Sequence, residues 1–346
     1  MRIKQVVVTG QNQVELQSLE LDARLGPDEI LIATECTFIS AGTELANYTG
    51  TEPQVFQKGA WCEYPWRSGY ANVGIVQAIG ERVTRCRVGQ RVFTCGPHAS
   101  AVKIDQHALV VPVPEGMDPD TAVATRMAGV ASSAAVMAEM PAHPWVAVFG
   151  LGLVGNLAAQ AFRILGGRVV GIDPVASRRA LAERCGIRPT LAGTAAEVQA
   201  QVSALTGGAL ADIVVDATGL TRVVCQALQA TANVGQLVLL GTPRAPLAGD
   251  VTEFVRGIHD RNITVRGALE WCVPVYPPVG MFGNKTLPLI SLYDKQQMIF
   301  DWVQSGQMHI APLVSHRLVP GQIKQAYEGL LREPETYTGV ALVWKA

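Results

Sequence analysis

The stretch Val146-Ala-Val-Phe-Gly-Leu-Gly-Leu-Val-Gly155 joins an apolar, β-branched run to three glycines in the spacing G-x-G-x-x-G. The first glycine permits a sharp turn after a strand, the second lets a phosphate approach the backbone, and the third allows a helix to pack closely on the strand. A helix that starts here would offer its free N–H groups to phosphate oxygens. A glycine-rich turn can also be purely structural, so the surrounding sequence has to decide between the two interpretations.

A second apolar run, Arg168-Val-Val-Gly-Ile-Asp173, ends in a carboxylate at the distance from the glycines where an acid would bind a ribose hydroxyl. The combination of strand, turn, helix and acid predicts a dinucleotide site rather than a plain βαβ unit. Because Asp173 would repel a 2′-phosphate, we expect NAD to be preferred over NADP. Arg179 nearby leaves some room for NADP.

The composition of the chain is typical of a compact protein with a large buried core. Of its 346 residues, 49% are hydrophobic and 16% are charged, and the formal net charge is −1. At this length we expect two domains. The near-zero charge gives no general attraction for nucleic acid or an anionic membrane. The N-terminal run lacks the apolar core of a signal peptide and the apolar helices are too short to span a bilayer, so we expect a cytoplasmic protein.

The seven cysteines are dispersed along the chain and include no C-x-x-C pair. An odd, scattered set is typical of reduced thiols in the cytoplasm rather than of a disulfide framework. The cysteines also lack the clustered spacing of a structural zinc site.

The period of the apolar residues changes near Gly129. Before it, short strand-like runs alternate with Gly and Pro; after it, predicted helices (130–139, 155–165, 177–185 and 221–230) alternate with buried-strand runs (146–149, 169–172, 213–216 and 235–240). The second pattern predicts an α/β fold with a doubly wound parallel sheet. After Arg266 the sequence is irregular and aromatic, and it then closes with a predicted helix and strand.

In this order and spacing, several short motifs make the chain similar to the medium-chain dehydrogenase/reductase superfamily. The motifs are Ser40-Ala-Gly-Thr-Glu44, Gly69-Tyr-Ala-Asn-Val-Gly74, Val88-Gly-Gln-Arg-Val-Phe93, the glycine turn, Asp173, Asp216-Ala-Thr-Gly219 and Gly235-Gln-Leu-Val-Leu-Leu-Gly241. The resemblance covers nearly the whole chain. It implies a GroES-like β-rich catalytic domain, 1–128 completed by 269–346, and a Rossmann dinucleotide-binding domain, 129–268.

The resemblance also implies a set of cofactor contacts on the second domain. They fall on Gly150, Gly152, Leu153, Val154, Gly155, Asp173, Arg178, Thr218, Gly219, Gly241, Thr242 and Pro243. Arg178 matches a family position that often carries a basic contact to the adenosine ribose. The near-terminal Gly-Lys pair of the family is Thr338-Gly339 here, so that contact is not carried over.

The family positions that hold the catalytic zinc match Ala41, Tyr70 and Met127 in this chain. None of these side chains is an ordinary zinc ligand, because Zn²⁺ takes thiolate, imidazole or carboxylate. The four-cysteine structural lobe of the family is also missing between Phe93 and Val110. The sequence therefore predicts a zinc-independent member without a metal site.

Without zinc, hydride transfer needs ordinary hydrogen-bond donors or acid–base groups. Tyr70 replaces a zinc-binding histidine, and its phenol either donates to a substrate oxygen or fills the vacated volume. Thr43 matches the proton-relay hydroxyl of the family. Glu44 matches the neighbouring acid, which either holds the loop or acts in the chemistry. His98 lies in a turn-like segment and is either a site residue or a structural one.

Aromatic residues cluster in two places, before Tyr70 and after the second domain. They are Trp61, Tyr64 and Trp66, and Trp271, Tyr276 and Phe282. They would either stack on a ring or sugar face of the substrate or pack at a rim or an interface.

These observations predict a zinc-independent, NAD-dependent oxidoreductase that interconverts an alcohol and a carbonyl on a polyfunctional small molecule by hydride transfer. Two alternatives stay open: an NAD(P)H-dependent reductase of an activated C=C or C=N bond, and a non-catalytic nucleotide-binding protein. We further expect a homo-oligomer, either a dimer or a tetramer, with neither nucleic-acid nor membrane partners.

Overall fold

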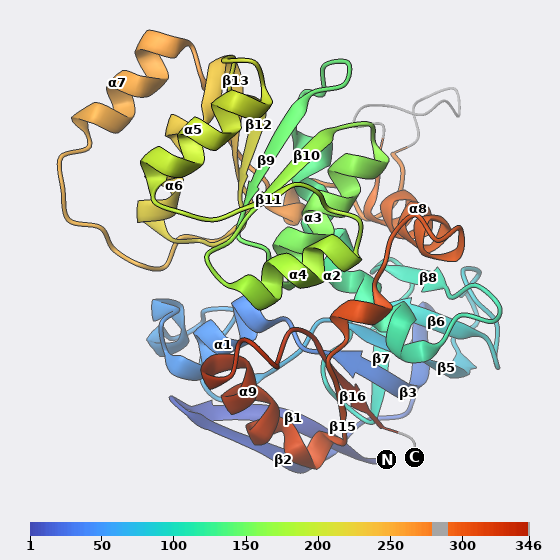
Figure 1. The fold of residues 1–346 in the computed structure, drawn as a ribbon. Helices are drawn as coiled ribbons and strands as arrows, with labels where there is room; N and C mark the ends of the chain where they lie inside the picture. The colour runs from blue at the N-terminus through green and yellow to red at the C-terminus, as the bar shows by residue number, and fades with distance from the viewer. Residues whose placement is uncertain (279–289, 345–346) are drawn as a thin grey trace. The chain divides into compact units, whose positions relative to one another are not determined.

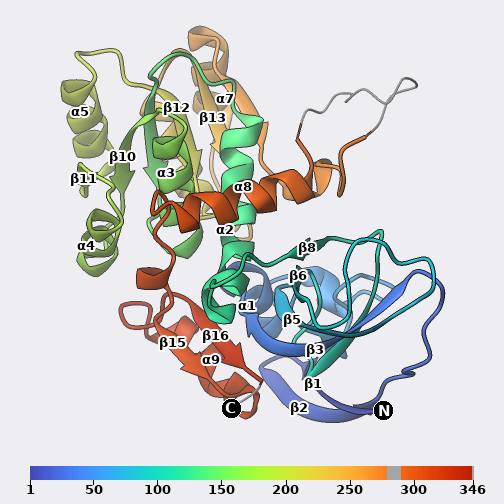
Figure 2. The ribbon, with the colours of Figure 1, turned by 90° about the vertical axis from the view of Figure 1, so that its right-hand side faces the viewer.

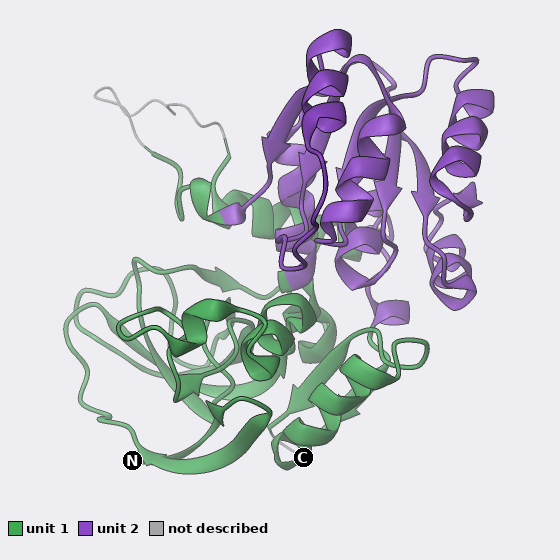
Figure 3. Cartoon of the chain, turned by 90° about the vertical axis from the view of Figure 1, so that its left-hand side faces the viewer, with its two compact units in different colours: residues 1–126, 271–304, 314–346 green, residues 127–270, 305–313 purple. Residues whose placement is uncertain are grey.

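The computed structural model describes residues 1–278 and 290–344, which form two compact units (Figure 3). Unit 1 comprises Met1–Arg126, Trp271–Gln304 and Val314–Ala346, and unit 2 comprises Met127–Glu270 and Ser305–Leu313. The short return of the chain to unit 2 at Ser305–Leu313 differs from the predicted segment 269–346, which was expected to belong to the first domain throughout. The roles of the units as catalytic and dinucleotide-binding domains stay predictions.

Unit 2 contains a six-stranded parallel sheet in the order β11-β10-β9-β12-β13-β14 (Figure 1). The strands are β9 (Trp145–Phe149), β10 (Arg168–Ile172), β11 (Thr190–Leu191), β12 (Ala211–Asp216), β13 (Thr231–Leu239) and β14 (Thr264–Gly267). The strand order reverses between β9 and β12, and in doubly wound sheets ligands bind beyond the carboxyl ends of the strands at such a point. The predicted fold class is confirmed.

Helices cover both faces of this sheet. They are α3 (Leu153–Ile164), α4 (Ala176–Arg184), α5 (Ala195–Leu205), α6 (Thr221–Gln229) and α7 (Thr252–Arg261), with the second half of α2 (Pro119–Met137). Successive residues of β9 point to opposite faces, so Val148 packs with Phe162 of α3 while Ala147 packs with Val202 of α5. Burial on both faces explains why the strands are continuous apolar runs.

Unit 1 is β-rich. Its larger sheet has the order β15-β16-β3-β5-β6-β8, with β7 also paired to β3, and a three-stranded sheet has the order β2-β1-β4. The strands are β1 (Arg2–Gly10), β2 (Gln13–Glu20), β3 (Glu29–Phe38), β4 (Trp66–Arg67), β5 (Asn72–Ile79), β6 (Arg91–Thr94), β7 (Ala101–Asp105), β8 (Val110–Pro112), β15 (His316–Leu318) and β16 (Val340–Val343).

The C-terminal segment completes unit 1. Strand β16 pairs antiparallel with β3, with Ala341 opposite Phe38. Helix α9 (Ile323–Arg332) packs near β2 and near α1 (Ala41–Thr49), as Figure 2 shows for the red and blue ends of the chain. Helix α8 (Leu292–Gln304) belongs to the same unit. None of the helices in residues 1–278 and 290–344 combines the length and the apolar character that crossing a membrane requires.

Candidate functional site

The turn between β9 and α3 requires its glycines for two different reasons. Gly150 has φ +89°, and a Cβ there would lie 2.7 Å from Cγ2 of Thr218. A Cβ on Gly155 would lie 1.8 Å from the carbonyl oxygen of Gly150, so α3 packs on the turn only with glycine at this position. A Cβ on Gly152, in contrast, would meet no described atom within 4 Å. The backbone at Gly152 is therefore open to a ligand.

Helix α3 presents its N-terminus at this turn. Gly152 is the N-cap, and no side chain of the described residues caps the helix there. The amide of Asn156 donates to the carbonyl oxygen of Gly152 at 2.9 Å, which leaves the preceding amides of Leu153, Val154 and Gly155 without an intrahelical acceptor. These N–H groups and the positive end of the helix dipole suit a phosphate oxygen.

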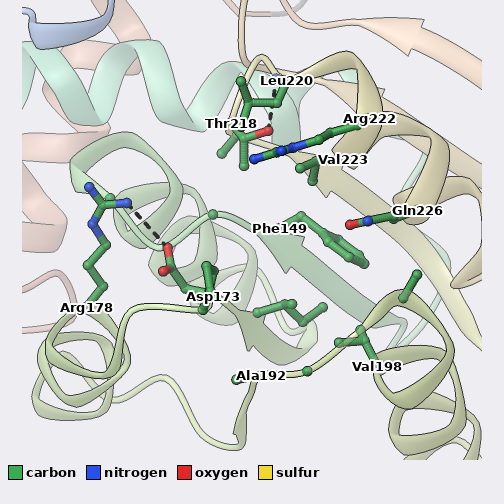
Figure 4. A pocket seen from close by; sticks show the side chains of 17 residues that line it. Phe149, Asp173, Arg178, Ala192, Val198, Thr218, Leu220, Arg222, Val223 and Gln226 are labelled. Atoms are coloured by element: carbon green, nitrogen blue, oxygen red, sulfur yellow. Dashed lines mark hydrogen bonds and ion pairs between the residues drawn. The ribbon is translucent and has the colours of Figure 1, made fainter. Parts of the chain in front are cut away.

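Asp173, which follows β10, is only 1% exposed, and its carboxylate ties the glycine turn to the strand. The amide of Leu151 donates to Oδ2 at 2.7 Å and that of Val175 donates to Oδ1 at 2.8 Å. Nη1 of Arg178 lies 3.8 Å from Oδ2 (Figure 4). A carboxylate has about four acceptor positions, so these contacts leave room for ribose hydroxyls.

A cavity of about 500 Å³ opens beside this turn, between the carboxyl ends of β9, β10 and β12 and helix α6 (Figure 4). Its volume lies within the usual range for small-molecule sites. The predicted residues Gly150, Gly152, Asp173, Arg178 and Thr218 line it. Two further polar lining residues come from α6 and were missed by the sequence reasoning, because no local motif marks them: Arg222 and Gln226.

The other predicted cofactor residues do not line this cavity: Leu153, Val154, Gly155, Gly219, Gly241, Thr242 and Pro243. Two of them follow Thr218 or contact the loop that carries it. Thr218 donates from N and Oγ1 to Oδ1 of Asp216 at 3.1 and 2.6 Å, and burial raises the pKa of the Asp216 carboxyl. A Cβ on Gly241 would lie 2.2 Å from the amide nitrogen of Gly219, so the loops after β12 and β13 touch. Thr242 and Pro243 continue the second loop.

In unit 1, Glu44 of α1 is the centre of a buried hydrogen-bond network. Its Oε1 accepts from the amide of Ser40 at 2.7 Å. Its Oε2 lies 2.9 Å from Nε2 of His98 and accepts from the hydroxyl of Tyr327 at 2.7 Å. The Tyr327 hydroxyl also lies 3.1 Å from Oγ of Ser68. Burial, reinforced by the Glu44 charge, raises the pKa of Tyr327 well above its ordinary value, so this phenol stays protonated and donates to Glu44.

His98 connects this network to the turn that carries Tyr70. Its amide donates to the carbonyl oxygen of Ser68 at 2.9 Å. Gly69 has φ +95°, and a Cβ there would lie 2.7 Å from the imidazole of His98, so only glycine allows the contact. Nδ1 of this fully buried histidine has no hydrogen-bond partner among the described residues. The structural interpretation of His98 is therefore the one that its contacts favour.

The hydroxyl of Tyr70 lies 2.5 Å from Oγ of Ser40, and we call these two side chains the hydroxyl pair. The guanidinium carbon of Arg126 lies 5.0 Å from the centre of the Tyr70 ring. Glu44 thus fixes Ser40 directly and fixes the turn before Tyr70 through His98.

Thr43 is half-buried in α1, and its hydroxyl makes no hydrogen bond among the described residues. Ser40 was not among the predicted site residues.

The donor set at the family's zinc positions does not fit a zinc ion. Ala41 and Met127 offer no ionisable group, and Tyr70 is engaged with Ser40. In residues 1–278 and 290–344, no cluster of three or more His, Cys, Asp or Glu side chains could hold a metal ion.

Most of the predicted aromatic residues are used in local packing. Trp61 packs edge-on against Trp66, with ring centres 5.9 Å apart, and Tyr64 packs in the same way against Phe56. The ring of Tyr276 lies under the guanidinium of Arg85 at 3.4 Å. Trp271 is 64% exposed, and Phe282 lies outside the described residues.

Comparisons with known proteins give a consistent result. The family model described as zinc-binding dehydrogenase matches residues 154–277. The L-threonine 3-dehydrogenase of Bacillus subtilis (strain 168) is 24% identical over 317 residues, which cover 82% of this chain and 85% of the relative. The D-guloside 3-dehydrogenase of Escherichia coli (strain K12) is 26% identical over 254 residues, which cover 68% and 72%.

Two solved structures share the fold along the whole chain. Galactitol-1-phosphate dehydrogenase from Escherichia coli superposes with a TM-score of 0.79 at 20% identity and covers 98% of this chain and 99% of its own. A short chain alcohol dehydrogenase from Escherichia coli CFT073, complexed with NADH, has a TM-score of 0.79 at 16% identity, with 99% of each chain covered. The chain is thus similar in sequence to dehydrogenases, and it shares its fold with the two solved dehydrogenase structures.

Proposed function

We propose that this protein is a zinc-independent, NAD-dependent dehydrogenase that interconverts an alcohol and a carbonyl on a polyfunctional small molecule. The observation that carries the proposal is the hydroxyl pair of Ser40 and Tyr70: Tyr70 matches a zinc-ligand position of the superfamily, and Ser40, next to a second such position, is held by the buried Glu44 carboxylate. The relatives act, by name, on a hydroxyl of threonine and of a guloside, and this supports a substrate with several polar groups.

Unit 2 would hold the cofactor. Bound NAD supplies the acceptor or donor of a hydride. The open backbone at Gly152 and the first amides of α3 would bind the pyrophosphate oxygens. The Asp173 carboxylate would accept from ribose hydroxyls, and its charge is kept in place by two backbone amides, which disfavours a 2′-phosphate. The cavity bounded by α6 would hold the adenosine part, with Arg222 beside it.

Unit 1 would carry the group that transfers the proton to or from the substrate oxygen. When a carbonyl is reduced, Tyr70 donates its phenolic proton to the carbonyl oxygen, and the Ser40 hydroxyl stabilises the charge that develops on the phenol. The nearby Arg126 guanidinium also favours that negative charge. In the oxidation direction the step runs in reverse, so the phenolate form of Tyr70 takes the proton from the alcohol and becomes the phenol. Neither Thr43 nor Glu44 transfers the proton: Thr43 is proposed to contact the substrate, and Glu44 to position the hydroxyl pair.

The test is turnover by protein whose metal content has been measured. Metal-depleted protein is incubated with NAD⁺ and a panel of hydroxy amino acids, glycosides and polyols, and NADH formation is followed together with the identity of the product. We expect one class to be oxidised at a carbinol carbon. A parallel assay supplies NADH with activated alkenes and imines. Turnover of these alone, or tight NADH binding without turnover of any compound in either assay, would contradict the proposal.

A further inference from the structure

Unit 2 contains a second cavity at the amino ends of the strands of the parallel sheet, opposite the carboxyl ends that face the first cavity. It has a volume of about 300 Å³ and lies where Trp145 begins β9 and Arg168 begins β10. The glycine turn and Asp173 follow the other ends of the same two strands. Five extended residues span about 17 Å, so the two cavities are separated by the length of the sheet. The second cavity therefore belongs to neither the nucleotide site nor the hydroxyl pair.

Three guanidinium groups line this second cavity: those of Arg163, Arg168 and Arg188. None of the described residues that line it is acidic, and none of the three arginines forms an ion pair with a described carboxylate. The acids on neighbouring elements hydrogen-bond to groups other than these arginines: Asp212 accepts from the amide of Trp145 and Glu183 accepts from Thr190. The described lining of the cavity thus carries three positive charges and no negative one.

Two of the arginines are held in place by backbone carbonyl groups. Nη2 of Arg163 donates to the carbonyl oxygen of Gln307 at 2.8 Å, and Nε of Arg168 donates to that of His143 at 3.0 Å. The Arg168 guanidinium also lies 4.6 Å from the ring centre of Trp145. Each guanidinium has five N–H donors, so these anchors orient the groups and leave most donors available. Nε of Arg163 is buried and has no hydrogen-bond partner among the described residues.

We propose that this cavity is a binding site for a phosphate group, either free or carried by a small organic molecule. Oriented guanidinium groups bind phosphate oxygens in bidentate fashion, and an anion would relieve the mutual repulsion of three cations. A volume of about 300 Å³ lies at the lower end of small-molecule sites, so the cavity admits a phosphate with a few attached atoms rather than a dinucleotide. The proposal does not depend on the proposed function: NADH serves in its test only to keep phosphate from the glycine turn, and the comparison with variants of the lining arginines isolates this cavity without it.

The test is calorimetric titration of inorganic phosphate into the protein saturated with NADH, which occupies the phosphate positions of the glycine turn. We expect one phosphate per chain, bound more weakly as salt increases. Arg188→Gln should weaken binding by about tenfold or more, because charged groups make strong hydrogen bonds to phosphate. Arg188 makes no hydrogen bond among the described residues, so this variant should fold normally. The double variant Arg168→Gln, Arg188→Gln should abolish binding.

Arg184→Gln is the matched control. Arg184 is exposed at the end of α4 and does not line the cavity, so this substitution removes the same charge outside the proposed site. A parallel titration with glycerol 3-phosphate distinguishes the two sources, since tighter binding than that of inorganic phosphate indicates an organic phosphate ester. Equal phosphate affinity in the unmodified protein and the double variant, an equal loss in Arg184→Gln, or no binding to the unmodified protein would overturn the proposal.

Discussion

Replacing Tyr70 by phenylalanine removes one oxygen atom from the hydroxyl pair and preserves the ring beside Arg126. If that oxygen gives and takes the proton, kcat should fall by about 100-fold or more, the usual scale for one positioned acid. A 100-fold loss corresponds to about 2.7 kcal/mol of transition-state stabilisation. The Kd for NADH should stay unchanged, because the proposed cofactor contacts belong to unit 2. The free energy of unfolding should fall by only about 1 kcal/mol, since one neutral hydrogen bond is lost.

The assay compares kcat, KM and NADH affinity for the unmodified enzyme, Tyr70→Phe and Ser40→Ala. Ser40→Ala should lose less activity than Tyr70→Phe, because Ser40 supports the phenol without delivering the proton itself. Tyr293→Phe is the matched control, because this phenol also accepts a hydrogen bond, from Gln297 at 3.2 Å, but takes no part in the network around Glu44. Near-native turnover of Tyr70→Phe would refute the proposed role and leave Thr43 as the next candidate.

Three further predictions follow from the same sites. Asp173→Ser should narrow the preference for NADH over NADPH, as measured by calorimetry; a tighter fit of NADPH to the unmodified protein would contradict the role of Asp173. Elemental analysis should find no stoichiometric zinc, and chelators should leave activity unchanged; about one zinc per chain, removed together with activity, would refute zinc independence. Burial and the Glu44 charge hold the pKa of Tyr327 above its ordinary 10.0. As pH rises through that value the unfolded state loses a proton that the native state keeps, so the free energy of unfolding should fall there. In Tyr327→Phe this alkaline fall, followed by denaturant unfolding, should be smaller; an identical fall would contradict the assignment.

The proposed nucleotide half of the site could be located in the sequence because its signals are local. The glycine turn, the strand before it and the acid of β10 all lie within 28 residues, from Val146 to Asp173. Helix α5 was missed although it had a local signal: Thr194 and Glu197 form a capping box at its N-terminus. Helix α2 begins at Pro119, whereas the sequence predicted a start at residue 130. The earlier turns could not be recognised, because their small and apolar residues show little of the 3.6-residue periodicity that marks a half-exposed helix.

The network around Glu44 could not be predicted in the same way, because its parts are distant in sequence. Tyr327 lies 283 residues after Glu44 and His98 lies 54 residues after it. A family motif points to Glu44 and the resemblance assigns 269–346 to the first domain, but only the packing of α9 near α1 brings Tyr327 to Glu44. From the sequence alone, Tyr327 is therefore indistinguishable from an ordinary buried residue on the apolar face of an amphipathic helix.

The same network would let the proposed zinc-independent site keep a fixed geometry. A metal ion holds side chains from separate segments at set distances, and here a buried carboxylate does so by accepting from three groups at once, including the amide of Ser40. Removing one donor leaves a buried charge less well compensated, which costs about 1.5–3 kcal/mol for a hydrogen bond to a charged group. The position of the hydroxyl pair therefore depends on the position of Glu44. Substitutions at Tyr327 or His98 should displace Tyr70, although Tyr70 itself is unchanged.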